Sequence, residues 1–531
     1  MGKFTAVIAA TTLLIGGMAV PAAAAIKDGS ACSKVGKVQV QAGARFTCAK
    51  SGSKLIWKKS KAVTSNTAKP PVLSGLPKEG DSCSGQAMPI GRSGAGILVY
   101  LSCGPDGHLH PQDGAPRIDQ ATGRPIAGPM GTLVSTAEYV TPPTMAGKPK
   151  SAISAASSDV TSCKIPDAGR NGDIPGNPQR HFVSGFGIYP ERAKLAGNPV
   201  IQFVPVDFAD VKATKAPKVD YAVVTKYLES FWETMGSKPL NVEIRVPDRY
   251  FHLPKKVLEY DLASDFFKTG KPPTGSFSYA QVAIDLADAA IDFSDVDIVA
   301  VVPAAEATEK QISSFTAQAA EPGQFFSTRE KPIANVLIAS VLTGGTPSEL
   351  LNWAHETGHM FGLTDTRNVP DTAAQDSSPL GVFDLMSSPF AAEILAWQRF
   401  ILGTINDNQV ACATSNLTAW LTPVEQRDQG VKLAVVPLTK YTAIGIESRR
   451  GYGYDSVLGS AAEGLIVYKI DTTVPYRKSP FTVITPPGAT DMEWKRDAAL
   501  KQGQSLTIEG VTVKNIESGS YGDVVSIEIA R

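Results

Sequence analysis

The sequence predicts a mixed α+β fold, in which a region of alternating strands and helices is followed by a β-rich C-terminal half. From about residue 163, apolar β-type runs alternate with helical segments, and one such run leads directly into a strongly capped helix. Short apolar runs separated by Gly, Pro and Asp then continue to the end of the chain, which predicts the β-rich half. Ahead of both parts, two cysteine-containing segments predict small disulfide-containing β modules.

The first 25 residues have the features of a secretory signal peptide. Lys3 precedes an apolar run from Phe4 to Val20, and the small-residue pattern Ala23-x-Ala25 predicts cleavage before Ile26. With 43% hydrophobic and 19% charged residues, the remaining chain is suited to a large core. No later stretch reaches the roughly 18 continuous apolar residues of a membrane span. We therefore expect a secreted, extracellular or cell-wall-associated protein without a membrane span and without a nucleic-acid partner.

Composition divides the chain into consecutive segments that we expect to behave as modules and linkers. They are a signal peptide (1–25), a small basic disulfide module (26–60), a Ser/Thr/Pro-rich linker (61–77), a second disulfide module (78–110), a Pro/Gly/Ser-rich linker (111–160), a globular domain (161–410) and a β-rich C-terminal region (411–531).

The cysteines predict disulfides, because six of them, an even number, lie in a chain that we expect to be exported. Fifteen pairings are open to six cysteines. Proximity in the sequence favours Cys32 with Cys48 and Cys83 with Cys103, which leaves Cys163 for Cys412. The first two pairs resemble an internal repeat, since each begins with Gly-x-x-Cys and has a glycine-containing turn after its second cysteine.

The first module is strongly basic. Residues 26–62 contain nine Lys or Arg and one acid, a net charge of +8, although the whole chain has a formal net charge of zero. A basic module at the N-terminus of an exported protein is typical of contact with an anionic cell-envelope polymer, such as teichoic acid or an acidic glycan. A solvated basic face without a partner is the open alternative.

In the globular domain the expected elements alternate between strands and helices. We expect strands at 199–208, 240–246, 296–302 and 335–340 and helices at 221–235 and 279–291. An amphipathic helix is expected at 391–403, and strands at 433–438, 441–447, 464–470, 505–512 and 524–529 predict a β-sandwich-like half. In such an order, one edge of the sheet can pair with an extended peptide through main-chain hydrogen bonds.

One helix combines a start signal with a stop signal. Thr346 is a suitable N-cap, Pro347 fits the first helical position, and Glu349 stands three residues after the cap, where it completes a capping box. Gly362 is suited to end the helix, because a residue without Cβ can adopt positive φ and turn the chain back.

This helix carries His355, Glu356 and His359 in the spacing His-Glu-x-x-His. Histidines four residues apart lie on one helical face and can bind one tetrahedral cation. Beside them, Glu356 can take a proton from a water that the metal activates, without being a ligand itself. The motif therefore predicts one catalytic Zn²⁺ and the hydrolysis of peptide bonds.

The positions of the histidines limit the candidates for the third ligand. None of the six lies C-terminal to His359, so a third histidine after Gly362 is excluded. Asp365 occupies the corresponding position, three residues past the glycine, and a carboxylate oxygen is an acceptable zinc ligand. Asp371 is the alternative ligand. Farther on, Met386 lies in Val-Phe-Asp-Leu-Met-Ser, which predicts the methionine-containing turn that underlies the metal in metzincin-type peptidases.

From about residue 180 to the end, the chain resembles the immune inhibitor A family of secreted bacterial zinc metallopeptidases. The resemblance rests on these pieces in their order: Phe-Val-Pro-Val-Asp-Phe, His-Glu-Thr-Gly-His-Met-Phe-Gly-Leu-Thr-Asp, Val-Phe-Asp-Leu-Met-Ser, Leu-Ala-Trp-Gln-Arg-Phe-Ile-Leu-Gly, Ile-Glu-Ser-Arg and Gly-Leu-Ile-Val-Tyr-Lys-Ile-Asp. It implies a metzincin-like zinc endopeptidase whose catalytic domain is 161–410. His355 and His359 would be ligands, Glu356 the general base and Met386 the Met-turn residue.

We therefore expect a secreted zinc metalloendopeptidase that acts on protein or peptide substrates. The alternative is a catalytically inactive peptidase-like scaffold that acts as a cell-envelope binding protein. Structural Ca²⁺ sites are left open by the sequence. Self-processing within the 111–160 linker is compatible with either function.

Overall fold

The computed structural model describes residues 27, 29–33, 38–41, 44–59, 78, 80–82, 90–92, 98–103, 108–111, 141–154, 159–170, 172–173, 181–262, 274–308, 311–312, 316–319, 325–344, 347–368, 379–387, 393–458, 460–475, 478–491 and 494–530. The predicted signal peptide, Cys83, Thr346 and Asp371 lie outside these residues. The first module belongs to one compact unit and the rest of the described chain to another, and each is described by itself.

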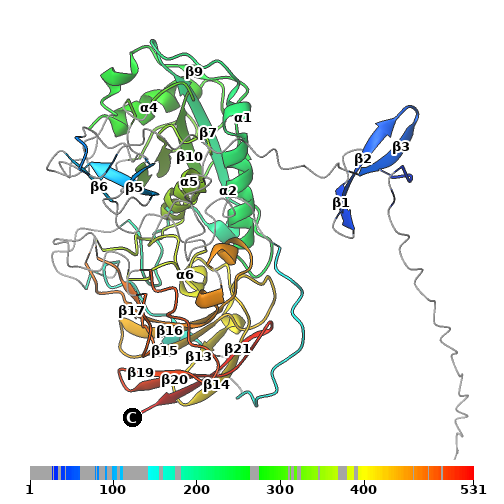
Figure 1. Cartoon of the computed structure of the whole chain (residues 1–531). Helices are drawn as coiled ribbons and strands as arrows, with labels where there is room; N and C mark the ends of the chain where they lie inside the picture. Colours follow the sequence, from blue (N-terminus) through cyan, green and yellow to red (C-terminus); the bar gives the residue numbers. More distant parts are fainter. Residues whose placement is uncertain are drawn as a thin grey trace, which may run out of the picture. The chain divides into compact units, whose positions relative to one another are not determined.

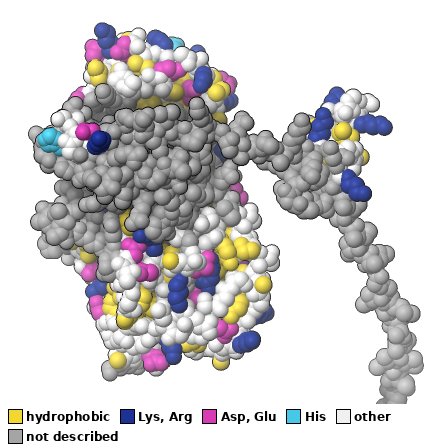
Figure 2. All heavy atoms as spheres, in the orientation of Figure 1, with side chains coloured by type: hydrophobic (Ala, Val, Ile, Leu, Met, Phe, Trp, Pro, Cys, Tyr) yellow, Lys and Arg dark blue, Asp and Glu magenta, His cyan; other side chains and the backbone are white. Residues whose placement is uncertain are grey.

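The first module is a three-stranded antiparallel sheet of β1 (Val38–Gln41), β2 (Ala44–Ser51) and β3 (Lys54–Lys59). Its small core consists of Cys48 and Trp57, which lie opposite each other on β2 and β3. The predicted disulfide between Cys32 and Cys48 is present and ties the preceding segment to this core. Figure 2 shows dark-blue Lys and Arg side chains on the described surface of this module. Exposed lysines include Lys50, Lys54 and Lys58.

The second module repeats this backbone arrangement. Its strands β4 (Ile90–Arg92), β5 (Leu98–Cys103) and β6 (Leu109–Pro111) also form a three-stranded antiparallel sheet. In the first module the N–H of Gly29 donates to the carbonyl of Trp57, and in the second the N–H of Gly80 donates to the carbonyl of Leu109. The matching hydrogen bonds support the predicted internal repeat. The predicted Cys83–Cys103 disulfide falls on a residue outside the described chain.

The globular part is organised around a mainly parallel sheet (Figure 1). Its strands are β7 (Val200–Asp207), β8 (Glu243–Arg245), β9 (Phe251–His252), β10 (Ile298–Pro303), β11 (Thr316–Ala319) and β12 (Asn335–Ile338). The order is β11-β12-β10-β7-β8, with β9 paired to one end of β7. Only β11, at the sheet edge, pairs antiparallel with its neighbour among these described strands. Continuous burial of β7 and β10 is explained by packing on both faces.

Helices cover both faces of this sheet. Residues Ile201 and Phe203 of β7 pack in one core with α2 (Ala222–Thr234) and α5 (Pro347–Met360). Residues Val204 and Val206 point to the other face and pack with α4 (Ser276–Ala287). The short helix α1 (Pro217–Asp220) precedes α2. Strand alternation thus produces two cores, one on each side of the sheet.

The C-terminal half is a sandwich of two sheets. One contains β13 (Val410–Cys412), β15 (Leu433–Pro437), β16 (Thr442–Arg449), β17 (Gly464–Asp471) and β18 (Phe481–Val483). The other contains β14 (Leu417–Leu421), β19 (Ser505–Ile508), β20 (Val511–Gly519) and β21 (Gly522–Ile529). Residues of both sheets share one core, among them Ile444, Val467, Val513 and Val525. The mixed α+β class and the β-rich C-terminal half agree with the sequence analysis.

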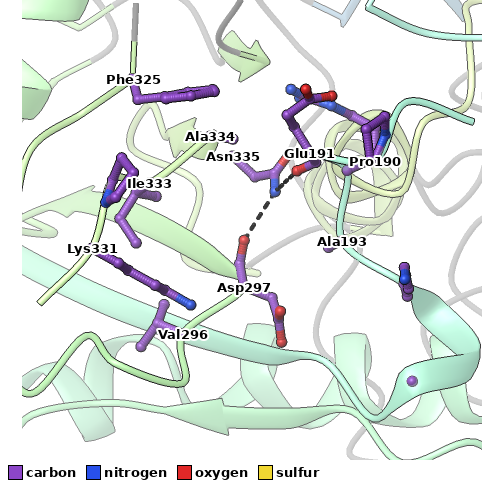
Figure 3. A pocket seen from close by; sticks show the side chains of 14 residues that line it. Pro190, Glu191, Ala193, Val296, Asp297, Phe325, Lys331, Ile333, Ala334 and Asn335 are labelled. Carbon is purple, nitrogen blue, oxygen red and sulfur yellow. Dashed lines mark hydrogen bonds between the residues drawn. The ribbon is translucent and has the colours of Figure 1, made fainter. Parts of the chain in front are cut away.

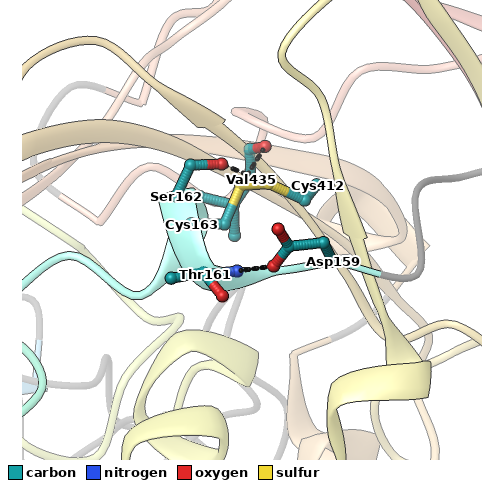
Figure 4. Close-up of a disulfide and its surroundings, with 6 residues drawn as sticks. All are labelled: Asp159, Thr161, Ser162, Cys163, Cys412 and Val435. Carbon is teal, nitrogen blue, oxygen red and sulfur yellow. Dashed lines mark hydrogen bonds between the residues drawn. A yellow bond between two sulfur atoms is a disulfide. The ribbon is translucent and has the colours of Figure 1, made fainter.

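The C-terminal sandwich also continues the core of the globular part. Leu433 and Val435 of β15 and Tyr468 of β17 lie in the same apolar cluster as the residues of α2 and α5. The Cys163–Cys412 disulfide, as predicted, joins the start of the globular part to β13 (Figure 4). In the same close-up, the Asp159 carboxylate accepts a hydrogen bond from the Thr161 N–H at 2.8 Å. The two halves are therefore linked by a shared core and by a covalent bond.

Residues 141–154 form an extended strap against the C-terminal sandwich. The Glu517 carboxylate of β20 accepts hydrogen bonds from the N–H groups of Lys150 and Ser151, each at 2.8 Å, and from the Ser151 hydroxyl at 2.6 Å. Tyr521 donates a further hydrogen bond to it at 2.6 Å. Led by the Ser151 and Tyr521 hydroxyls, these donors lower the pKa of Glu517 to about 2. This part of the predicted 111–160 linker is hydrogen-bonded to the globular unit.

Two expected elements differ in the structure. The expected strand at 505–512 is a hairpin of β19 and β20, because Glu509 and Gly510 have φ of +50° and +77° and form a two-residue turn. The expected amphipathic helix at 391–403 is the shorter α6 (Ala396–Ile401), and every residue of α6 is buried. Phe186 of the globular part packs on Trp397 and Phe400, and the C-terminal half contacts α6 through hydrogen bonds from Ala396 to Glu447 and from Arg399 to the Val424 carbonyl. Among the described helices, none is long and apolar enough to cross a membrane.

Candidate metal centre

The helix α5 runs from β12 back across the sheet and packs its apolar side on α2 and β7. At its start, the Glu349 carboxylate accepts a hydrogen bond from the Gly344 N–H at 2.9 Å, while the predicted cap Thr346 lies outside the described residues. At its end, the N–H of Gly362 donates to His359 O and that of Leu363 to Gly358 O. Gly362 has φ of +102°. These two hydrogen bonds are those of a Schellman motif, so the glycine stops the helix as predicted.

The structure brings together the three predicted ligands. In the described chain, His355, His359 and Asp365 are a group whose possible ligand atoms all lie within 4.8 Å of one another. Asp365 Oδ1 is 3.2 Å from Nε2 of His355 and 3.8 Å from Nε2 of His359. The imidazole planes are nearly perpendicular, at 89°. The turn at Gly362 thus returns the chain to the helix face that carries both histidines.

Both histidines are oriented through their other ring nitrogen. His355 Nδ1 lies 3.1 Å from the carbonyl oxygen of Leu385, and His359 Nδ1 lies 2.8 Å from that of Leu363. A carbonyl accepts only, so Nδ1 carries the proton and Nε2 of a neutral ring keeps its lone pair toward Asp365. Phe182 packs on the His359 ring, with 4.7 Å between ring centroids. The arrangement holds both Nε2 atoms toward one point, as a metal site requires.

The charges of the site favour a cation. Burial alone would lower the pKa of His355, but the hydrogen bond and charge of Asp365 raise it to about 9 in the metal-free chain. Burial alone would raise the pKa of Asp365, yet the two histidines and Arg367 hold it well below its ordinary value. The Asp365 carboxylate is therefore ionised. In the metal-free chain a proton shared with His355 compensates this negative charge, and a bound metal ion would compensate it in place of that proton.

The predicted Met-turn lies directly beneath the helix. A Cβ atom added to Gly358 of α5 would be only 2.8 Å from Sδ of Met386. The carbonyl of Met386 accepts a hydrogen bond from the N–H of Thr366, the residue after Asp365, at 2.9 Å. Leu385, one residue before, supplies the carbonyl that orients His355. The turn therefore contacts the helix between its two histidines and also the loop of the third predicted ligand.

Glu356 follows His355 on α5 and is partly exposed, as expected for a group that exchanges protons with a bound substrate or water. It is close enough to His355 to raise the pKa of that imidazole by its charge. The alternative ligand Asp371 lies outside the described residues. Sequence reasoning did not identify the carbonyls of Leu363 and Leu385, since a backbone acceptor has no residue-type signal.

Behind the Met-turn lies a group of buried charges. Arg449 of β16 donates to Glu447 Oε1 at 2.6 Å and to the Asp455 carboxylate. It also donates to the carbonyls of Phe383 and Ile394, at 3.1 and 3.2 Å. Because Phe383 precedes the Met-turn, this arginine fastens the turn to the C-terminal sandwich. Its guanidinium is fully buried and compensated by carboxylates, as such a charge must be.

A separate pocket of about 480 Å³ lies at the amino ends of β7, β10 and β12 (Figure 3). On its wall, the amide of Asn335 donates to the backbone carbonyls of Glu191 and Asp297 at 2.9 and 3.0 Å. The wall segment also touches the end of α5, since the N–H of Ala193 donates to the carbonyl of Met360. His355, His359 and Asp365 are not among the described residues that line this pocket. The hollow is thus distinct from the metal centre.

Comparison with protein-family models gives no match to this chain, and comparison with curated proteins gives none either. A functional hypothesis for this chain therefore rests on the residues of the site.

Proposed function

We propose that this chain is a secreted zinc-dependent endopeptidase in which Glu356 is the general base. The observation that carries the proposal is that three possible metal-ligand atoms converge beside Glu356. The carboxylate of Glu356 lies on α5, the helix that carries both histidines. His355, His359 and Asp365 present two imidazole nitrogens and one carboxylate oxygen within 4.8 Å. Three nitrogen and oxygen ligands with a fourth position left for water are typical of catalytic rather than structural zinc.

A zinc ion in this site would polarise the scissile carbonyl and acidify the attacking water. Glu356 would then be the group that takes a proton from the water and delivers it to the leaving amine. The carbonyls of Leu363 and Leu385 keep both histidines in the ligand tautomer. This assignment, with Met386 in the supporting turn, is the one that the resemblance to the immune inhibitor A family and a metzincin-like fold imply.

The edge strand β11 supports a peptide as the substrate. It is the antiparallel edge of the central sheet and lies against α5. Such an edge offers main-chain donors and acceptors to an extended chain, so protein or peptide substrates can add as a further strand. The backbone contacts are independent of side chains, which favours an endopeptidase over an enzyme that reads one small molecule.

The test compares the full wild-type chain with Glu356→Gln, which keeps the size of the side chain and removes the base. We expect about one zinc per chain in both proteins, chelator-sensitive cleavage of casein by wild type, and a loss of cleavage of about 10²–10⁴-fold in the variant. Glu233→Gln on α2, an exposed helical glutamate, is the matched control. A folded, zinc-containing wild-type chain without chelator-sensitive cleavage would support the inactive scaffold instead.

The exposed lysines of the first module support a second role, contact with an anionic cell-envelope polymer. Three of them, Lys50, Lys54 and Lys58, are exposed on one short β module. We expect the full chain to bind teichoic acid at low ionic strength and to lose binding in high salt. Replacing the three lysines by glutamate should abolish binding, and a neutral polysaccharide is the control ligand. If the triple variant binds teichoic acid as well as the wild-type chain does, this role is refuted.

A further inference from the structure

The residue after the third predicted ligand is held by two hydrogen bonds to the Met-turn. Thr366 is fully buried, its N–H donates to the carbonyl of Met386 at 2.9 Å, and its hydroxyl donates to the carboxylate of Asp384. Thr366, the residue that follows Asp365, is therefore held through both its backbone and its side chain. Because Asp365 itself is on a loop, this attachment determines where its carboxylate lies.

Asp384 is a fully buried carboxylate with no metal-binding role in the proposed site. Its Oδ2 accepts from Thr366 and also from Nε2 of Gln398 on α6, at 3.1 Å. Its backbone carbonyl accepts from the N–H of Ser387 at 3.0 Å, which closes the turn that contains Met386. Both donors contact Oδ2, and an ionised carboxylate can only accept hydrogen bonds. Its burial is costly unless such donors stabilise it.

The same turn reaches a second predicted ligand. Leu385, the residue after Asp384, accepts the hydrogen bond from Nδ1 of His355. The N–H of Leu385 in turn donates to the carbonyl of Glu393 at 3.2 Å. A displacement of Asp384 would therefore affect the Asp365 loop directly and the orientation of His355 through the backbone.

We propose that Asp384 and Thr366 are positioning residues, which hold the Asp365 carboxylate at the point where the two histidines converge. This inference rests on the proposed zinc site and adds residues that do not touch the metal or the substrate. Thr366 acts through its hydroxyl, and Asp384 acts as the acceptor that connects the ligand loop, the Met-turn and α6. Groups of this kind typically change metal affinity by about 10–100-fold when they are removed.

The experiment separates the hydroxyl of Thr366 from its methyl group in the full chain. Thr366→Val keeps the shape and removes the hydrogen bond, whereas Thr366→Ser keeps the hydroxyl and removes a methyl group. Zinc affinity is measured by competition with a chromophoric chelator, and the visible spectrum of the cobalt-substituted protein reports the ligand geometry. Thr422→Val is the matched control, because Thr422 is a buried threonine whose hydroxyl donates to the carboxylate of Asp428 at 3.1 Å, in the C-terminal half.

We expect Thr366→Val to lose zinc affinity about 10–100-fold, with an altered cobalt spectrum and a lower kcat at nearly unchanged KM. Thr366→Ser and Thr422→Val should keep the wild-type affinity and spectrum. If Thr366→Val does not fold, Thr366→Ala removes the hydroxyl without a branched side chain, and its zinc affinity relative to Thr366→Ser decides. If the zinc affinity of Thr366→Val, or of Thr366→Ala in its place, equals that of wild type, the inference is overturned.

A double-mutant cycle tests whether the two residues act together. If Asp384 acts through Thr366, the chain with Thr366→Val and Asp384→Ala should lose no more zinc affinity than the weaker-binding single variant. Strictly additive losses would contradict the connection. Zinc affinity and the cobalt spectrum are measured without proteolysis. A wild-type chain that binds no zinc would therefore refute the proposed function, whereas a zinc-binding wild type with unaffected variants refutes only this inference.

Discussion

At the scale of single residues, the candidate site depends on where Asp365 lies. The histidines were predictable because both belong to one helix, whose spacing alone places them on one face. Asp365 was predictable only in part, since the positive φ of Gly362 reverses the chain but does not say where the loop ends. Its position depends on Thr366 and Asp384, and the pairing of two residues 18 positions apart has no local sequence signal.

Replacing Asp365 by alanine should remove zinc and peptidase activity together. The variant loses the only carboxylate of the three-residue group and leaves two imidazoles, which cannot complete a three-ligand site. Zinc per chain, measured after gel filtration, is the readout. Asp371→Ala is the control and should keep the metal. If zinc remains in Asp365→Ala and is lost in Asp371→Ala, the third ligand is Asp371.

Contact between α5 and the Met-turn can be tested at Gly358. An alanine inside a helix usually stabilises by about 1 kcal/mol relative to glycine. Here the added Cβ would meet Sδ of Met386 at 2.8 Å, and because Met386 is fully buried its side chain has little room to move, so we expect an overpacking cost of about 1–3 kcal/mol. We therefore expect Gly358→Ala to lower the free energy of unfolding in chemical denaturation. In a Met386→Ala background the same substitution should be neutral or stabilising, and destabilisation in both backgrounds would contradict the contact.

At the scale of elements, β7, β8, β10 and β12 of the central sheet were predicted, whereas the short strands β9 and β11, of two and four residues, were not. The α5 start, stop and ligand face all follow from local chemistry. By contrast, α6 shows no exposed face because both halves of the globular unit pack on it, so its apolar pattern did not predict its surroundings. The Glu509-Gly510 turn was missed because glutamate is an unusual residue at positive φ.

The strap of residues 141–154 should be released in acid. The pKa of Glu517 is held at about 2, below its ordinary value of 4.5, so its contribution to docking is complete above about pH 4.5 and is lost as the pH falls toward 2. We expect the amides of Lys150 and Ser151 to lose protection from hydrogen exchange in this window, after correction for the intrinsic rate. Glu517→Gln should lose that protection already at pH 7.

The control for the strap is Glu528→Gln, because Glu528 is an exposed glutamate on the neighbouring strand β21. It should leave the exchange of Lys150 and Ser151 unchanged at every pH. Protection that persists in Glu517→Gln at neutral pH would show that other contacts, such as the hydrogen bond between the Ser154 N–H and the carbonyl of Thr418, are sufficient.

At the scale of the whole molecule, the sequence division at residue 410 does not coincide with a break in the core. Apolar residues of β15, β17 and β18 pack with those of α2 and α5 in a single cluster. Arg449, from the C-terminal half, binds carbonyls on both sides of the Met-turn. Composition could suggest a β-rich half, but only three-dimensional packing shows that this half supports the predicted active site.

A chain that ends at residue 410 should therefore fail to fold. Truncation would expose the apolar surface that β15 and β17 cover and would leave Cys163 without its partner. We expect the intact globular part to unfold in one calorimetric transition and the truncated chain to lack the near-ultraviolet circular dichroism of packed aromatic residues. A soluble truncated chain with the wild-type spectrum would show that the catalytic region is independent.

X-ray absorption at the zinc edge determines directly whether His355, His359 and Asp365 hold one zinc ion. For the purified full chain, we predict two nitrogen ligands at about 2.0–2.1 Å, oxygen ligands at about 2.0–2.2 Å from Asp365 and water, and no sulfur. Glu356→Gln should give the same first shell, because Glu356 is not a ligand. A sulfur shell at about 2.3 Å, or a chain that binds no zinc when dialysed against the metal, would contradict this zinc site.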